Sequence, residues 1–114
     1  MDEREFWAFL KGRPKASQVS AVMEGSGEAG RYIQGHNLLP AGYDTLPEIE
    51  VAAMGCLLLS RETSIAAKEA LLMILAHQPS ETALTTLAKY CLNPDRPLAF
   101  YAQMALEECA MWNG

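Results

Sequence analysis

The second half of the chain carries the same helical pattern twice, 35 residues apart. Moving residues 81–113 back by 35 positions places seven residues on identical ones: Cys91 on Cys56, Leu92 on Leu57, Arg96 on Arg61, Ala88 on Ala53, Ala102 on Ala67, Ala105 on Ala70 and Leu106 on Leu71. A period of roughly 20–50 residues is typical of stacked repeats. The repeat therefore predicts an all-α fold, a short right-handed α-α superhelix in which residues 46–79 and 80–114 each form one hairpin.

Apolar spacing and breaks in the sequence predict where the four helices of these hairpins lie: about 46–59, 63–77, 81–92 and 96–112. Thr45 and Glu48 have the spacing of a capping box, and Ser80 is placed to cap the third helix. The helix at 63–77 is apolar on nearly every side, so we expect it to be the most buried. Alanines at matching repeat positions should let the helices pack closely: Ala67, Ala70, Ala102 and Ala105.

The first part of the chain, residues 1–45, lacks the repeat. Residues 2–11 predict a helix with Phe6 and Phe9 on its apolar face, which should dock on the first hairpin and close its core. A short helix near 15–24 and one helical turn near 29–34 are expected within an otherwise irregular, glycine-rich segment. With 114 residues in all, the chain is predicted to form a single domain.

The second hairpin has a recognisable turn. Asn93-Pro94-Asp95-Arg96-Pro97-Leu98, followed by Ala102-x-x-Ala105-Leu106, resembles the turn and second helix of a HEAT repeat. The nearest variety is the short bacterial, phycobilisome-lyase-like one, and the resemblance covers residues 46–113. It implies paired helices joined by a sharp Asp-Pro turn. Two departures leave a tetratricopeptide-like or unrelated array of helical hairpins open. Ser60-Arg61-Glu62 replaces that turn in the first repeat, and Leu98-Ala99 and Thr63-Ser64 stand where the family often has Val-Arg.

Composition excludes several classes of function. The net charge is −5, and no cluster of basic residues offsets it, so no nucleic-acid partner is expected. The uninterrupted apolar runs, such as residues 56–59, are far too short to cross a membrane. An odd number of cysteines and no signal peptide predict a cytoplasmic protein, with Cys56, Cys91 and Cys109 as reduced core residues.

One motif suggests a cofactor. Gly25-x-Gly27-x-x-Gly30 matches a dinucleotide-binding pattern, with Glu48 and Glu50 about 20 residues further on. That pattern works between a buried strand and a long helix. The preceding strand is weak and no second strand is predicted, so we interpret the glycines as a linker and expect no cofactor.

The two histidines are the other candidates. His77 closes its helix, where the ring can bond free carbonyl groups. His36 lies near Tyr32 and Tyr43 in the irregular segment, where a ligand would be sought, although an exposed loop is the simpler interpretation. The neighbouring pair Glu107-Glu108 is expected to be solvated, and no spacing of His, Cys or carboxylates resembles a metal site. No catalytic or metal-binding residue is therefore predicted.

The leading functional hypothesis is a non-enzymatic protein–protein interaction or scaffold module. Phe100, Met104 and Met111 lie on the face of the last helix opposite its core face, and they are expected to contact a protein partner or a second copy. Residues 25–45 could instead cover this face. Two alternative functions stay open: an accessory domain or subunit of a lyase-like enzyme, which the resemblance suggests, and a small-ligand-binding protein that uses residues 25–45. Whether the protein is an enzyme is left open, with a non-enzyme favoured.

Overall fold

The computed structural model describes residues 1–11, 30–33, 36, 39 and 42–114. Within these ranges the regular structure is entirely helical, which confirms the all-α prediction. The predicted helix at 15–24 and most of the glycine motif lie outside the described residues, whereas residues 30–33 form the expected helical turn. The elements are α1 (Glu3–Lys11), η2 (Tyr43–Thr45), α3 (Glu48–Leu59), α4 (Ile65–Leu75), α5 (Glu81–Leu92), η3 (Arg96–Leu98) and α6 (Ala99–Asn113).

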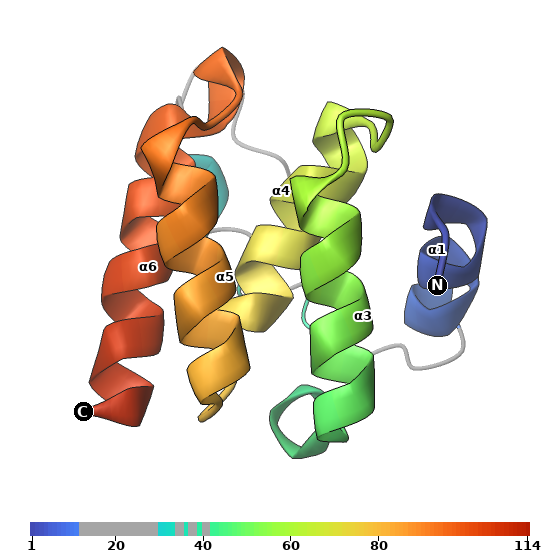
Figure 1. Cartoon of the computed structure of the whole chain (residues 1–114), viewed down its shortest axis with the longest axis horizontal. Coiled ribbons are helices and arrows are strands. Elements are labelled where there is room, and N and C mark those ends of the chain that lie inside the picture. Colours follow the sequence, from blue (N-terminus) through green and yellow to red (C-terminus); the bar gives the residue numbers. More distant parts are fainter. Residues whose placement is uncertain (12–29, 34–35, 37–38, 40–41) are drawn as a thin grey trace.

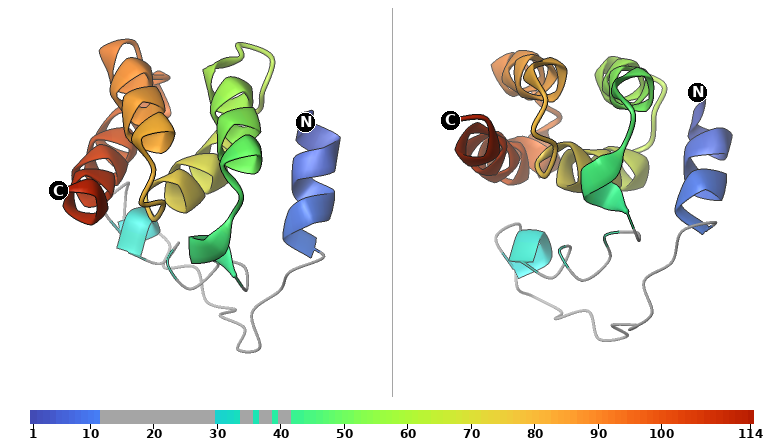
Figure 2. Two further views of the ribbon diagram at one scale, coloured as in Figure 1. Left: turned by 60° about the horizontal axis from the view of Figure 1, so that its bottom comes forward. Right: turned by 90° about the horizontal axis from the view of Figure 1, so that it is seen from below.

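The four long helices after η2 form two layers. α3 and α5 lie side by side in one layer, and α4 and α6 form the other (Figure 2). Each hairpin crosses between the layers, because α4 returns antiparallel to α3 and α6 returns antiparallel to α5 (Figure 1). The predicted helices are thus confirmed to within about two residues at most ends, and α5 has the predicted bounds.

The core is centred on α4, as its apolar character on nearly every side predicted. Residues 71–76 are all buried, because α1, α3, α5 and α6 all contact this helix. Ala67, Ala102 and Ala105 are fully buried and Ala70 partly so, which fits their predicted role at close helix contacts. Tyr101 is the largest fully buried side chain.

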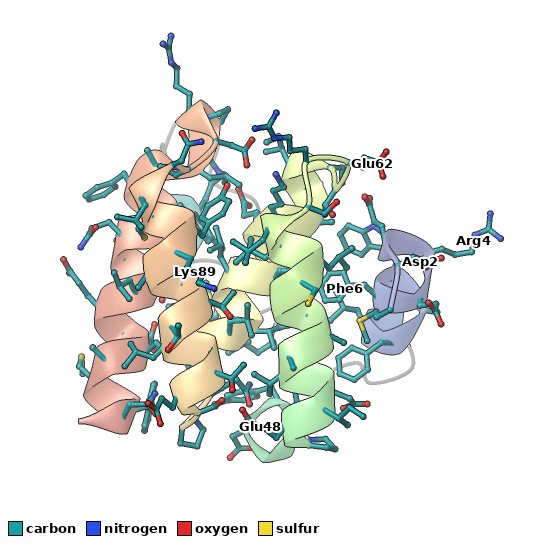
Figure 3. The ribbon with its side chains drawn as sticks, in the orientation of Figure 1. Asp2, Arg4, Phe6, Glu48, Glu62 and Lys89 are labelled. Carbon is teal, nitrogen blue, oxygen red and sulfur yellow. The ribbon has the colours of Figure 1, made fainter. Side chains whose placement is uncertain are left out.

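The first helix docks on the first hairpin, which confirms the prediction for residues 2–11. Phe6 is fully buried and lies between α1 and this hairpin (Figure 3). The carboxylate of Glu3 accepts hydrogen bonds from the backbone N–H (2.9 Å) and the hydroxyl (2.7 Å) of Ser64. Ser64 also caps α4, since its hydroxyl accepts a bond from the N–H of Ala67. The contact therefore joins α1 to the N-terminal end of α4.

The capping prediction for α3 is wrong. Pro47 is the N-cap of α3 and makes no side-chain cap bond. The carboxylate of Glu48 instead accepts a 2.6 Å bond from the hydroxyl of Ser80. That donor lies at the start of the next hairpin, so the local pattern could not reveal it. Ser80 also caps α5, as predicted, by accepting a bond from the N–H of Ala83.

The cysteines were predicted to lie in the core, and this holds only for Cys109. Cys91 is half-buried and Cys56 is exposed. Cys56 lines a hollow together with Met1 and Asp2. None of the helices in the described ranges is both long enough and apolar enough to cross a membrane.

Candidate metal centre

Three side chains that are far apart in the sequence meet at one end of the helical stack. His36 follows the helical turn at residues 30–33, His77 follows α4, and Glu108 lies on α6. The Nε2 atom of His36 is 2.9 Å from Oε1 of Glu108, and Nε2 of His77 is 2.7 Å from Oε2. The three potential ligand atoms all lie within 4.8 Å of one another. Both rings are therefore directed at the same carboxylate.

The opposite nitrogen of each ring is fixed by the backbone. Nδ1 of His36 lies 2.9 Å from the carbonyl oxygen of Tyr32, and Nδ1 of His77 lies 2.8 Å from that of Met73. A carbonyl oxygen can only accept, so each Nδ1 carries the proton that it donates. In a neutral ring it is then Nε2 that carries the lone pair. Such an Nδ1 bond to a carbonyl is the usual support of a metal-binding histidine.

Glu108 is held from several sides. Its side chain is 21% exposed, and Oε1 accepts a hydrogen bond from the hydroxyl of Tyr32. Burial alone would raise the pKa of Glu108, but the bonds from Tyr32 and His36 and the charges of the two histidines outweigh it and lower the pKa. The carboxyl group is thus kept ionised, in the form that binds a cation.

Aromatic side chains surround this cluster. The His36 and His77 rings meet edge to face at 4.8 Å, and the Tyr32 ring packs edge to face on His36 at 5.0 Å. Tyr43 and Trp112 lie against His77, with ring centroids at 5.5 Å and 6.4 Å. Burial and the bond to Glu108 raise the pKa of Tyr32, so its hydroxyl stays protonated and acts as a donor. The rings limit how the imidazoles can turn.

Two further contacts position the cluster. Arg31 donates a 3.0 Å bond to Glu69 of α4, which anchors the helical turn that leads to His36. Gln78, next to His77, is buried and donates to the carbonyl oxygens of Tyr43 (2.6 Å) and Ile74 (3.0 Å). The connection after α4 is therefore fixed where it presents His77.

The thiol next to the cluster is not part of it. Cys109 is fully buried and donates to the carbonyl oxygen of Gln78. Burial raises the pKa of Cys109 to about 11, although a bond from Asn113 opposes this. The sulfur is thus a neutral thiol, whereas a metal ligand or nucleophile would be the thiolate.

Parts of this site could be foreseen from the sequence. The prediction that His77 bonds a helix carbonyl is confirmed, but the prediction that Glu108 is solvated is wrong. Its partner Glu107 is exposed, as expected. On a helical wheel Glu108 falls within about 40° of Tyr101 and Trp112, at the margin of the core face. That position is the signal in the sequence that distinguishes Glu108 from its exposed neighbour Glu107.

His36 is not a simple exposed loop residue. Its side chain is 36% exposed and is held at both ring nitrogens. Although no metal site was predicted from residue spacing, the described residues contain this one group of three potential ligands. The ligands come from three separate segments, so no spacing motif could reveal them.

The three residues predicted to bind a partner, Phe100, Met104 and Met111, differ in their exposure. Phe100 is 53% exposed and Met111 is 79% exposed, whereas Met104 packs partly against the core.

Comparison with known proteins finds no similarity: no family model matches the chain, and neither do any curated proteins or solved structures.

Proposed function

We propose that this protein binds a divalent first-row transition metal ion, such as zinc, through His36, His77 and Glu108. One observation carries the proposal: two imidazoles, each fixed at Nδ1 by a backbone carbonyl, direct Nε2 at a single ionised carboxylate. Imidazole and carboxylate together suit zinc and iron(II), whereas calcium and magnesium prefer oxygen ligands alone.

The dimensions of the cluster fit such an ion. With bonds of about 2.0–2.2 Å, tetrahedral zinc brings its ligand atoms to roughly 3.4 Å from one another. To reach this spacing, the Nε2–Glu108 contacts of 2.9 and 2.7 Å would lengthen slightly, and the widest separation, at most 4.8 Å, would shorten. Three protein ligands leave one tetrahedral position for water or a further ligand.

The hydrogen atoms that the contacts between the histidines and Glu108 require also favour a bound metal ion. A carboxylate, like a carbonyl, only accepts hydrogen bonds, so each Nε2 contact to Glu108 is a hydrogen bond only when that nitrogen carries a proton. Two positive rings would then lie edge to face at 4.8 Å. A metal ion replaces both of these protons and lets the rings be neutral.

Metal titration tests the proposal with a matched pair of variants. Zinc is titrated calorimetrically into tag-free protein that has first been treated with a chelator. We expect one ion per chain, and Glu108→Gln and His36→Ala should weaken binding by at least about tenfold. Glu107→Gln, the exposed neighbour, should bind like wild type, and magnesium should produce no binding heat.

Equal zinc affinity of the Glu107→Gln and Glu108→Gln variants would contradict the site, and so would a wild-type protein that binds no zinc. His77 is only 5% exposed, so its replacement could unfold the chain. The Glu108 and His36 variants therefore carry the test, with circular dichroism to verify their fold.

This proposal gives a specific form to the ligand-binding alternative, since His36 belongs to the segment at residues 25–45. A second candidate is the interaction module, built as a HEAT-like superhelix. The two layers of antiparallel hairpins and the exposed side chains of Phe100 and Met111 support it. The partner would be a second copy or another protein.

Light scattering and partner pull-down test this second candidate. The Phe100→Ser, Met111→Glu double variant should lose a self-association or a bound partner that wild type shows. Ile49→Glu is the control, because Ile49 is equally apolar and 80% exposed but lies on α3. A folded double variant with unchanged mass and unchanged partner binding would exclude this surface.

A further inference from the structure

A second polar site lies at the other end of α4. A cavity of about 480 Å³ opens where α3 and α5 end, and its polar lining comes from Arg61, Lys68, Lys89, Tyr90, Asn93 and Asp95. Lys68 and His77 are nine residues apart along α4 and its continuation, which corresponds to roughly 13 Å of helical rise. The cavity is therefore separate from the candidate metal centre, and a ligand bound in the cavity would share no residue with that centre.

The floor of the cavity is rigid. The side chain of Lys68 is 6% exposed, and its Nζ donates a 2.8 Å bond to Oδ2 of Asp95. The hydroxyl of Tyr90 donates to the same oxygen at 2.6 Å and accepts a bond from the backbone N–H of Asp95. Nζ of Lys68 also lies 5.9 Å from the centroid of the Tyr90 ring. The buried ammonium group of Lys68 is thus held in one place at the floor of the cavity.

Lys68 has donors left over. An ammonium group carries three N–H bonds, and one of them reaches an acceptor in the described part of the chain, at Asp95. A buried charge is costly unless its hydrogen bonds are made. Because Lys68 lines the cavity, an acceptor bound there could take the remaining donors.

The cavity also has more positive than negative charge. Arg61 and Lys89 line it together with Lys68, whereas Asp95 is the one acidic lining residue in the part of the chain that the structure describes. Three of the nine basic residues therefore converge on one cavity, although the chain as a whole carries a net charge of −5. Neither Arg61 nor Lys89 forms an ion pair with an acid in the described ranges. Lys89 lies on α5 on the side toward α3 (Figure 3).

We propose that this cavity binds a small, multiply charged oxyanion, namely a molecule that carries phosphate or several carboxylate groups. Arg61 would bind two oxygens of the anion through its planar guanidinium group. Lys68 would supply its unused donors from the floor, and Lys89 would add a positive charge from the rim. Asp95 keeps Lys68 oriented, and its single negative charge is outweighed by the three positive charges of the lining.

The test uses metal-free, full-length protein, so that an anion cannot bind through a metal ion. Pyrophosphate and citrate are titrated separately at constant ionic strength and followed by calorimetry. Saturable binding of one molecule per chain is expected for at least one of them. The preferred anion then shows whether the natural ligand carries phosphate or carboxylates.

Three variants make the test specific. Arg61→Gln and Lys89→Gln change exposed side chains, so both should fold, and each should weaken binding by about tenfold through the loss of a charged contact. Arg4→Gln removes the same charge from the exposed outer side of α1 and should bind like wild type (Figure 3). The proposal is overturned if neither anion saturates the protein at millimolar concentration. Equal losses in the Arg61 and Arg4 variants would also overturn it, because they would reveal attraction to net charge alone.

Discussion

The two ends of α4 differ in what their polar groups can still bind. At the N-terminal end Lys68, together with Arg61 and Lys89, presents donors and positive charge that Asp95 matches only in part. At the C-terminal end His36 and His77 direct ring nitrogens at one carboxylate, which forms the candidate set of ligands for a cation. The dipole of α4 favours the same ligands, since a helix dipole attracts anions near the N-terminus and cations near the C-terminus. At each end, the polar groups that still lack a partner thus determine whether an anion or a cation is the suitable ligand.

The largest loss of stability is expected from replacing Phe6, the side chain that anchors α1. Phe6 is fully buried, and Phe6→Ala should reduce the free energy of unfolding by about 3–5 kcal/mol, through lost apolar burial and the cavity left behind. Chemical denaturation measures this loss. If the ends of α4 are independent, the folded variant keeps its zinc affinity. A parallel loss of zinc binding would mean that α1 also supports the metal centre.

Zinc should stabilise the protein almost as strongly. At a free zinc concentration about 100 times Kd, one site adds about 2.7 kcal/mol, enough to raise Tm by several degrees. Thermal unfolding with and without zinc measures this shift. Glu108→Gln should clearly reduce it and Glu107→Gln should retain it in full. A shift that is undiminished in Glu108→Gln would place the ion elsewhere.

Overpacking α6 should distinguish the two repeats. Ala105 is fully buried, whereas Ala70 at the matching position is only partly buried. Ala105→Leu should therefore cost about 1–3 kcal/mol, and Ala70→Leu should cost less. Denaturation midpoints compare the two variants. Unchanged midpoints in both would contradict the close packing of the hairpins.

The smallest change in stability is expected at acidic pH, from the Asp95 carboxylate at the end of α4 that carries Lys68. The hydrogen bonds from Lys68 and Tyr90 lower the pKa of Asp95 below its unfolded value of about 3.9. The ionised carboxylate thus stabilises the fold fully above this value, and its contribution is lost as the pH falls through the lower folded pKa. Wild type should be more stable than Asp95→Asn near neutral pH, with a difference that shrinks below about pH 4. Denaturation of both proteins across this range measures the difference, and the contribution of Glu108 is common to both. A difference that stays constant with pH would show that the ionised carboxylate of Asp95 adds no stability.

Much of the fold could be predicted because it depends on local patterns. The bounds of α5 were predicted to the residue, since Ser80 caps its start and Asn93-Pro94 follows its end. The burial of α4 followed from its sequence, which is apolar on nearly every side, and the docking of α1 followed from its aromatic face. The bond between Glu48 and Ser80 could not be predicted, since it joins two hairpins.

The candidate sites depended on the tertiary structure. Sequence periodicity indicates which face of a helix is buried, and this was enough to place Ala102, Ala105 and Cys109 in the core. It does not fix how far α6 slides along α4, and that register decides whether Glu108 reaches His77 and whether Asp95 reaches Lys68. Hydrogen bonds and metal coordination need polar atoms within about 3 Å of each other, a precision that arises only when packed helices fix their relative positions. The sequence by itself therefore determined the helices and their buried faces, and the packing of those helices decided which polar groups meet.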